Sequence, residues 1–346
     1  MTNFERLRPW GWNDEVEAIV TPLIAAGRTG GDPLEAGRIV RVDRGEVDVA
    51  TGIDDGEVVR ATNTTAAKDC VAGDWVVFDR SQARVEAIAP RITAFVRRSA
   101  RGARTGQTLA ANMDVVLVVQ GLDPGLHVRR LERELVLAHQ SGATPLVVLT
   151  KTDTVDPSVV ASSIAAAEHC APGSVVVAVS NRNGDGFDRL RELVQPARTF
   201  ALLGSSGVGK STLVNSFAGS EIMREGEIRE GDGKGRHTTT AARLLYLADG
   251  RLLLDTPGVR ALALWESWEG LADTFPEIED AAENCGFADC FHDNEPKCAV
   301  IGGVAEGTID GERLESWRRL RDEMQQLDAH LVDQQRKAER TGRPPR

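Results

Sequence analysis

The chain has 346 residues, of which 41% are hydrophobic and 27% charged, and its formal net charge is -11. This length accommodates several domains, and the negative charge argues against a protein that coats nucleic acid indiscriminately, so RNA binding would need a local basic patch. No apolar run approaches the roughly 20 residues of a transmembrane helix, and residues 1–18 lack a signal-peptide core, so we expect a cytoplasmic protein with no membrane partner.

Residues 1–34 are expected to form an N-terminal arm that ends in the loop-like stretch RTGGDP. Between residues 35 and 95 the sequence reads as five short strands separated by turn residues: GRIVRVD, EVDVAT, EVVRAT, DWVVFD and RVEAIA. Strands of this length and spacing suit a small barrel, and an OB-fold β-barrel is the leading interpretation. A barrel of SH3 type is the alternative.

The next segment, residues 96–112, is expected to be a basic linker. The stretch from Ile88 to Met113 contains no acidic residue, and its five arginines are Arg91, Arg97, Arg98, Arg101 and Arg104. Arginines beside an OB-like barrel favour a contact with RNA phosphates, and a solvated linker face is the alternative.

From residue 113 to 265 apolar strands alternate with helical stretches. Strands are expected at 115–119, 145–150, 175–179, 200–203 and 252–254, and helices near 128–140, 157–169 and 187–194. This alternation is typical of a multidomain α/β protein with a mostly parallel sheet and helices on both faces.

A phosphate-binding loop lies between the strand at 200–203 and a helical stretch at 212–217. The sequence GSSGVGKS matches G-x-x-x-x-G-K-[ST] in full. Its glycines let backbone N–H groups point at phosphates, Lys210 supplies a positive charge near the β- and γ-phosphates, and the Ser211 hydroxyl can ligate Mg²⁺. The residues expected to bind nucleotide here are Gly204, Ser205, Ser206, Gly207, Val208, Gly209, Lys210, Ser211 and Thr212.

The sequence DTPG follows a later strand. Asp255 at the strand end can hold Mg²⁺ through water, and the backbone N–H of Gly258 can sense the γ-phosphate. The motif D-x-x-G is common by itself, and its pairing with the phosphate loop makes it informative.

Thr150, Lys151, Thr152 and Asp153 resemble the guanine-reading N-K-x-D motif, with threonine in place of asparagine. The Asp153 carboxylate can accept hydrogen bonds from the guanine N1–H and amino group, a donor pair that adenine lacks. Ser180, which follows another strand, fits the weaker S-A-type loop that supports guanine. A phosphate-loop ATPase or kinase is the alternative, and it would make Asp153 coincidental.

The order of these motifs is unusual, because the guanine motifs at 150 and 180 precede the phosphate loop at 204 and the DTPG sequence at 255. In ordinary GTPases the phosphate loop comes first. We therefore expect a circularly permuted P-loop GTPase domain over residues 113–265, a rearrangement that close termini permit.

Val259 occupies the position where Ras-like enzymes carry a water-orienting glutamine, so hydrolysis should be slow alone and accelerated by a partner. The glycine-rich segment 231–240 is a candidate switch. In it, Thr238 or Thr239 is a candidate ligand of Mg²⁺ and the γ-phosphate, and His237 could orient the water.

Residues 266–346 are expected to form a zinc-binding and helical C-terminal domain that ends in a helix from 311 to about 340. The ligand set Cys285, Cys290, His292 and Cys298 falls within a short stretch and suits one structural, tetrahedral Zn²⁺. Buried free thiols are the alternative. Cys70 and Cys170 stand alone, and a disulfide framework is not expected in an intracellular chain.

Taken in this order, the chain resembles the ribosome small subunit-dependent GTPase A (RsgA) family over nearly its whole length. The motifs that carry the resemblance are Gly11-Trp12-Asn13, Asp74-Trp75-Val76, Ala110-Ala111-Asn112-Met113-Asp114, Arg129-Arg130-Leu131-Glu132-Arg133, GSSGVGKST, GRHTT, DTPG and the four zinc ligands.

The resemblance implies a late maturation factor that binds the 30S subunit, contacts 16S rRNA and hydrolyses GTP to GDP and phosphate when the subunit stimulates it. It assigns water orientation to His237, so the expected catalytic residues are His237, Lys210 and Thr239. The implied ligands are GTP or GDP, Mg²⁺ and one Zn²⁺. We expect no DNA partner and a monomeric chain. The alternative is an RNA-binding assembly scaffold that uses GTP mainly as a conformational ligand.

Overall fold

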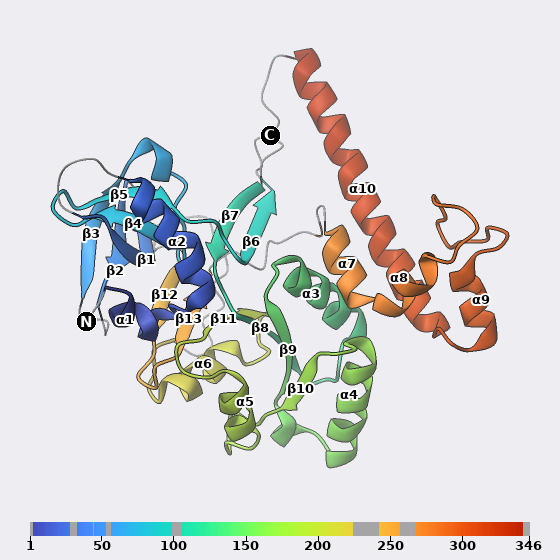
Figure 1. Cartoon of the computed structure of the whole chain (residues 1–346). Coiled ribbons are helices and arrows are strands. Elements are labelled where there is room, and N and C mark those ends of the chain that lie inside the picture. The colour runs from blue at the N-terminus through green and yellow to red at the C-terminus, as the bar shows by residue number, and fades with distance from the viewer. Residues whose placement is uncertain are drawn as a thin grey trace.

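A computed structural model of the chain describes residues 3–27, 33–43, 45–52, 57–98, 106–223, 242–256, 264 and 267–341 (Figure 1). Eleven strands form one continuous sheet in the order β10-β9-β8-β11-β13-β12-β1-β2-β3-β5-β4. The first six strands of this order belong to the nucleotide domain and the last five to the N-terminal barrel.

The barrel strands match the five segments expected from the sequence: β1 (Glu35–Asp43), β2 (Glu46–Ala50), β3 (Val58–Asn63), β4 (Trp75–Asp79) and β5 (Arg84–Ile88). The barrel closes because β1 also pairs with β4, from Glu35 opposite Phe78 to Arg38 opposite Trp75. β3 and β5 pair in parallel, and alternate side chains such as Ile39, Val49 and Phe78 fill the interior. A closed, OB-like five-stranded barrel is thus confirmed.

The N-terminal arm contains two α-helices, α1 (Asn3–Leu7) and α2 (Asp14–Ala26), which the sequence patterns had not identified. The Asn13 side chain accepts a hydrogen bond from the Val16 N–H at 3.0 Å and so caps α2. Trp12 stacks on Phe4 at 4.8 Å between ring centroids and meets the edge of Trp75 at 5.3 Å. These aromatic contacts fix the arm against the barrel.

Part of the segment expected to be a basic linker is a separate two-stranded antiparallel sheet of β6 (Ala94–Arg98) and β7 (Gly106–Ala111). The run of arginines indicated a linker, although the sequence alternates around Phe95, which is buried while Val96 is exposed. Arg101 and Arg104, and the side chain of Arg98, lie outside the described residues.

Five strands of the nucleotide domain are parallel: β8 (Val115–Gly121), β9 (Thr144–Thr150), β10 (Val175–Ala178), β11 (Thr199–Leu203) and β13 (Leu252–Asp255). β12 (Arg243–Tyr246) runs antiparallel to β13. Helices α3 (Val128–Gln140) and α4 (Pro157–Cys170) contribute to the core on one face, while α5 (Phe187–Leu193) and α6 (Lys210–Ala218) contribute to the other. The expected sheet with helices on both faces is therefore present.

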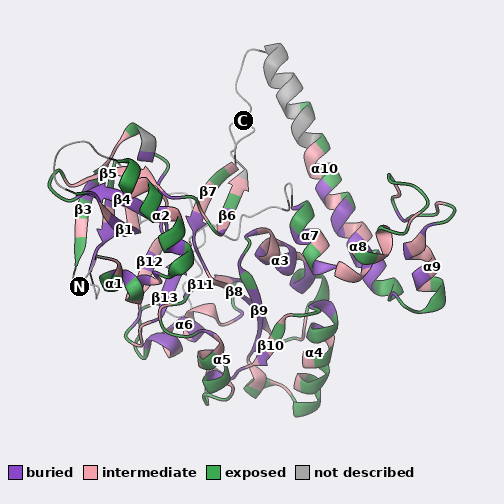
Figure 2. Cartoon of the chain, viewed as in Figure 1, coloured by how far each residue is buried: buried purple, intermediate pink, exposed green. Residues whose placement is uncertain are grey.

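The C-terminal region consists of α7 (Trp268–Thr274), α8 (Pro276–Ala282), α9 (Ala299–Glu306) and the long α10 (Gly311–Thr341). Its core joins Leu271, Phe275, Trp317 and Met324 to Val136 of α3, so this region packs on the nucleotide domain. Buried residues of α10 lie in the part nearest α8 (Figure 2). In the described chain, no helix combines the length and apolar character needed to cross a membrane.

One buried arginine connects the arm, the barrel and the strand that leads into the nucleotide domain. The Arg38 guanidinium donates to the backbone carbonyls of Trp10, of Gly73 at 3.3 Å and of Asn112 at 2.6 Å. It also lies 4.9 Å from the centroid of the Trp75 ring. Desolvation lowers the pKa of Arg38 to about 10. This value is still well above neutral pH, so the side chain remains charged.

Candidate nucleotide-binding and metal sites

The phosphate loop runs from the end of β11 at Leu203 to the start of α6 at Lys210. Gly204 has a φ of +140°, and a Cβ there would lie 2.5 Å from the Val119 carbonyl oxygen, so only glycine fits. Gly207 and Gly209 also have positive φ angles. Ser206 and Gly207 are exposed, which leaves the tip of the loop open to a ligand.

Lys210 places its ammonium group across this loop. Its Nζ donates to the Gly204 carbonyl at 2.7 Å and to the Ser205 carbonyl at 2.5 Å. Ser211 and Thr212 follow in the first turn of α6 and are half-buried. The loop, the helix N-terminus and the lysine thus come together as the sequence predicted.

The guanine-motif residues lie against the same loop. Thr150 is fully buried at the end of β9, and its hydroxyl donates to the Val208 carbonyl at 2.5 Å. This threonine therefore connects residues 150–153 to the phosphate loop by its side chain. Lys151 adopts a left-handed φ of 61°, and Thr152 begins the short helix that carries Asp153.

Asp153 is exposed, and one of its carboxylate oxygens accepts a hydrogen bond from the Ser180 hydroxyl at 2.8 Å. The next residue, Asn181, donates its side-chain amide to the Gly209 carbonyl at 3.1 Å. The Asn181 Oδ1 is buried and has no partner among the described residues. Asn181 was not singled out from the sequence, although its position beside Ser180 could have indicated it.

Two residues of α3 also approach the phosphate loop, and the sequence analysis had not assigned them to the site. The Arg130 Nη1 donates to the Ser205 hydroxyl at 3.2 Å. Glu134, one turn further along, accepts a hydrogen bond from the Gln120 amide at 2.6 Å. Burial raises the pKa of Glu134 to about 7, and the charges of Lys210 and Arg130 partly oppose that rise.

Asp255 ends β13, the strand that neighbours β11, and is half-buried. The other residues expected near the γ-phosphate lie outside the described part of the chain: His237, Thr238, Thr239, Gly258 and Val259.

The predicted zinc ligands come together within the C-terminal region. The ligand atoms of Cys285, Cys290, His292 and Cys298 all lie within 4.8 Å of one another. The Cys285 and Cys298 sulfurs are 3.9 Å apart, and the His292 Nδ1 is 3.6 and 3.4 Å from them. Zn–S bonds of about 2.3 Å in a tetrahedron place two sulfurs about 3.8 Å apart, so the residues fit a structural zinc ion.

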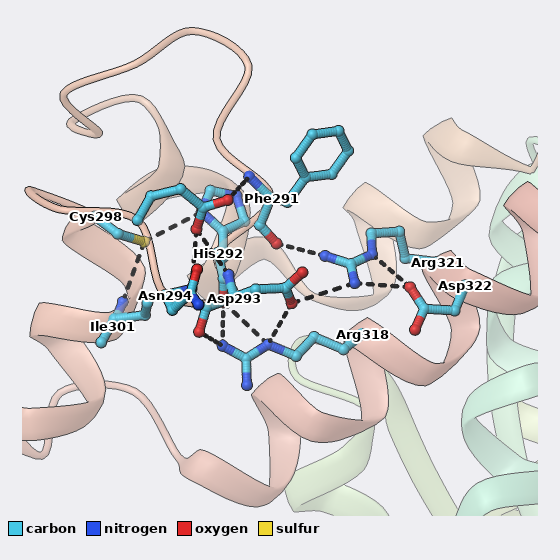
Figure 3. A network of polar contacts seen from close by, with 10 residues as sticks. Phe291, His292, Asp293, Asn294, Cys298, Ile301, Arg318, Arg321 and Asp322 are labelled. Carbon is cyan, nitrogen blue, oxygen red and sulfur yellow. Dashed lines mark hydrogen bonds and ion pairs between the residues drawn. The ribbon is translucent and has the colours of Figure 1, made fainter.

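The loop that holds these ligands is fixed from two sides (Figure 3). The Glu295 carboxylate accepts backbone N–H bonds from Phe291 at 3.0 Å, Asp293 at 2.9 Å and Asn294 at 3.1 Å. From α10, Arg318 donates to the His292 carbonyl and Arg321 to the Phe291 carbonyl. Side chains other than the four ligands, namely Glu295, Arg318 and Arg321, therefore hold this loop in place.

The arginines of the basic stretch differ in their contacts. Arg91 pairs with the fully buried carboxylate of Asp74, with 2.7 Å between Nε and Oδ1, and its Nη1 donates to the Thr108 hydroxyl at 2.7 Å. Its guanidinium therefore stabilises the junction between barrel and hairpin. Arg97 donates to the Gln107 side chain at 3.0 Å on the exposed hairpin surface.

Comparison with known proteins supplies the context for this geometry. A family model described as RsgA GTPase matches residues 88–265, and one described as 50S ribosome-binding GTPase matches residues 199–338. The chain is 42% identical over 333 residues to the small ribosomal subunit biogenesis GTPase RsgA of Streptomyces coelicolor, covering 95% of this chain and 89% of that one. A protein of the same name from Methanosarcina acetivorans is 40% identical over 91% of this chain and 84% of its own.

Two solved structures share the fold. YjeQ from Thermotoga maritima aligns with a TM-score of 0.64 at 25% identity, covering 84% of this chain and 98% of that one. YloQ, described as a circularly permuted GTPase, aligns with a TM-score of 0.63 at 23% identity, covering 86% and 98%. With the phosphate-loop strand β11 following the guanine-motif strands β9 and β10, the chain belongs to the RsgA GTPase family and is a circularly permuted GTP hydrolase.

Proposed function

We propose that this protein is a GTPase of late small-subunit maturation that acts in the cytoplasm on the 30S subunit, contacts 16S rRNA and releases GDP and phosphate. The observation that carries the nucleotide part is that Thr150 and Asn181 donate to carbonyls of the phosphate loop, while Ser180, beside Asn181, donates to Asp153. The ribosomal part is supported by relatives named small ribosomal subunit biogenesis GTPase, which align over most of this chain.

In this proposal the loop from Gly204 to Thr212 binds the phosphates, and Asp153 reads the guanine N1–H and amino group. The Ser211 hydroxyl and the Asp255 carboxylate offer the oxygen ligands that Mg²⁺ prefers. Asp255 ends β13, and Ser211 lies in the first turn of α6, the helix that follows the neighbouring strand β11. Mg²⁺ would neutralise charge on the β- and γ-phosphates when bound. Gly258 and either Thr238 or Thr239 would complete the contacts with the γ-phosphate.

For hydrolysis we propose that Lys210 stabilises charge on the phosphates, Thr239 orders the Mg²⁺ site and His237 orients the attacking water. Val259 cannot hydrogen-bond that water, so turnover should be slow without the ribosomal subunit. Cys285, Cys290, His292 and Cys298 would hold one structural Zn²⁺. We further propose that the protein acts as a monomer.

The RNA contact is proposed for the exposed part of the arginine-rich hairpin, where Arg97 lies. Arg91 is left out of it because its guanidinium is engaged with Asp74. Arg318 and Arg321 donate to the loop that holds the candidate zinc ligands, and Arg319 pairs with Glu132 of α3. These three arginines are therefore also left out of the RNA contact.

The test is GTP turnover measured with and without purified 30S subunits. We expect slow release of phosphate from the protein alone and a strong increase when subunits are added. An RNA-binding scaffold would bind GTP and co-sediment with subunits without any increase in turnover. Equal turnover at all subunit concentrations would therefore favour the scaffold.

A further inference from the structure

The first turn of α3 presents a guanidinium group to the phosphate loop. Arg130 is exposed, and the bond to the Ser205 hydroxyl at 3.2 Å is the only hydrogen bond that its side chain makes with the described residues. A guanidinium has five N–H donors, so most of its donor capacity is unused. Arg133, on the same helix, is instead paired with Glu323 of α10.

Two cations converge on this one loop residue. Lys210 donates its ammonium hydrogens to the Ser205 and Gly204 carbonyls, while Arg130 approaches the Ser205 hydroxyl. All of these acceptors are neutral. Hydrogen bonds between arginine and phosphate are charge-assisted and can be bidentate, so a phosphate anion is a stronger partner for Arg130 than a hydroxyl.

Glu134, an acid whose charge acts on both cations, does little to neutralise them. Glu134 gives its carboxylate oxygen to the Gln120 amide, and because burial raises its pKa to about 7 it is only partly ionised at neutral pH. Glu134 therefore offsets the charges of Lys210 and Arg130 only in part.

We propose that Arg130 binds an oxygen of the GTP γ-phosphate, so that an arginine of this chain helps the loop to distinguish GTP from GDP. The inference rests on the proposed nucleotide site. In hydrolysis, the water oxygen bonds to the γ-phosphorus while the bond from that phosphorus to the bridging oxygen breaks, and the water protons remain with the phosphate and solvent. Negative charge spreads over the equatorial oxygens in this step, and a guanidinium at one of them stabilises it.

The experiment compares Arg130→Ala with Arg129→Ala in the full-length protein. Arg129 is the matched control because it is the adjacent exposed arginine on the same helix, and its side chain makes no hydrogen bond or ion pair with the described residues. Dissociation constants for GDP and for a non-hydrolysable GTP analogue, both with Mg²⁺, are measured by calorimetry. Single-turnover GTP hydrolysis is measured in parallel.

We expect Arg130→Ala to weaken binding of the GTP analogue by roughly ten- to hundred-fold while GDP affinity changes less than about two-fold. Arg129→Ala should leave both constants near those of the wild type. Arg130→Lys should recover part of the analogue affinity, because it keeps the charge but loses the planar fork. Hydrolysis by Arg130→Ala should fall further than the analogue affinity, because the contact strengthens as charge develops.

A second variant separates phosphate binding from positioning of the loop. Ser205→Ala removes the hydroxyl partner and should alter the affinities for GDP and the analogue by the same factor. If Arg130→Ala also changed the two affinities equally, the arginine would act only on the loop and the inference would be wrong. A wild-type protein that bound neither nucleotide would instead refute the proposed function itself.

Discussion

In the proposed nucleotide site Asp153 selects the base, and its surroundings are consistent with that role. It is exposed, and Ser180 from the neighbouring strand end holds one of its oxygens at 2.8 Å. The base-reading segment is anchored to the phosphate loop by the buried Thr150 hydroxyl, which substitutes for the usual asparagine. The loss of asparagine therefore does not detach the base-reading segment from the loop.

Replacement of Asp153 by asparagine should exchange guanine for xanthine as the preferred base. The new amide can donate to the xanthine C2 carbonyl, whereas it can no longer accept both guanine donors. GDP affinity should fall by roughly a hundred-fold or more, as expected for unpaired polar groups in a specific site. Titration with GDP and XDP measures this exchange, and Asp156→Asn, at an exposed position in the same loop, is the control. An unchanged preference for GDP over XDP would show that Asp153 does not read the base.

At the scale of elements, the sequence predicted the barrel strands and the α/β domain well because apolar periodicity is a local signal. The strand at 115–119 and the helix at 128–140 correspond to β8 and α3. The hairpin of β6 and β7 was not predicted, because its arginine-rich sequence indicated a linker and its alternation of apolar and polar residues is weak. Contacts such as Arg130 with Ser205, which lie 75 residues apart, leave no local trace in the sequence at all.

The loop of residues 285–298, which holds the four candidate zinc ligands, likewise combines a local signal with long-range contacts. Spacing alone predicted the four ligands, but the helix that holds their loop could not be foreseen. Arg318 and Arg321 lie among acidic residues in the sequence, yet they donate to the carbonyls of His292 and Phe291 respectively. Only the tertiary fold brings α10 to that loop.

Loss of one zinc ligand should therefore loosen α7–α10 without abolishing nucleotide binding. Cys290→Ser is expected to lose most of its bound zinc, because a structural site needs all four ligands. Zinc content by elemental analysis and backbone hydrogen exchange over residues 270–330 provide the readouts. Asp289→Asn, at the exposed neighbouring position, should retain zinc. Equal zinc in Cys290→Ser and the wild type would contradict the assignment.

At the scale of the whole molecule, Arg38 connects three parts that are far apart in the sequence. Its guanidinium satisfies carbonyls of Trp10 in the arm, Gly73 in the barrel and Asn112 before β8. Because all of these groups are buried, the contacts cannot be replaced by water without opening the junction.

Arg38→Met should lower the free energy of unfolding by about 3 kcal/mol, because it fills much of the same volume but leaves buried acceptors without donors. Chemical denaturation monitored by tryptophan fluorescence measures the change. Arg60→Met is the control, since Arg60 is an exposed barrel arginine whose ion pairs with Asp43, Glu46 and Asp48 lie on the surface and contribute little. Equal stability of the two variants would show that the junction does not depend on Arg38.

The pairing of β1 with β12, at Arg41 opposite Arg243, gives the barrel and the nucleotide domain a shared backbone ladder. β12 also directly precedes β13, which ends at Asp255. A partner that displaces the barrel thus acts on a strand beside the nucleotide site, and thermodynamic linkage makes that influence reciprocal. If that partner is the ribosomal subunit, as proposed, the factor by which the bound subunit changes the affinity for GTP must equal the factor by which GTP changes the affinity for the subunit.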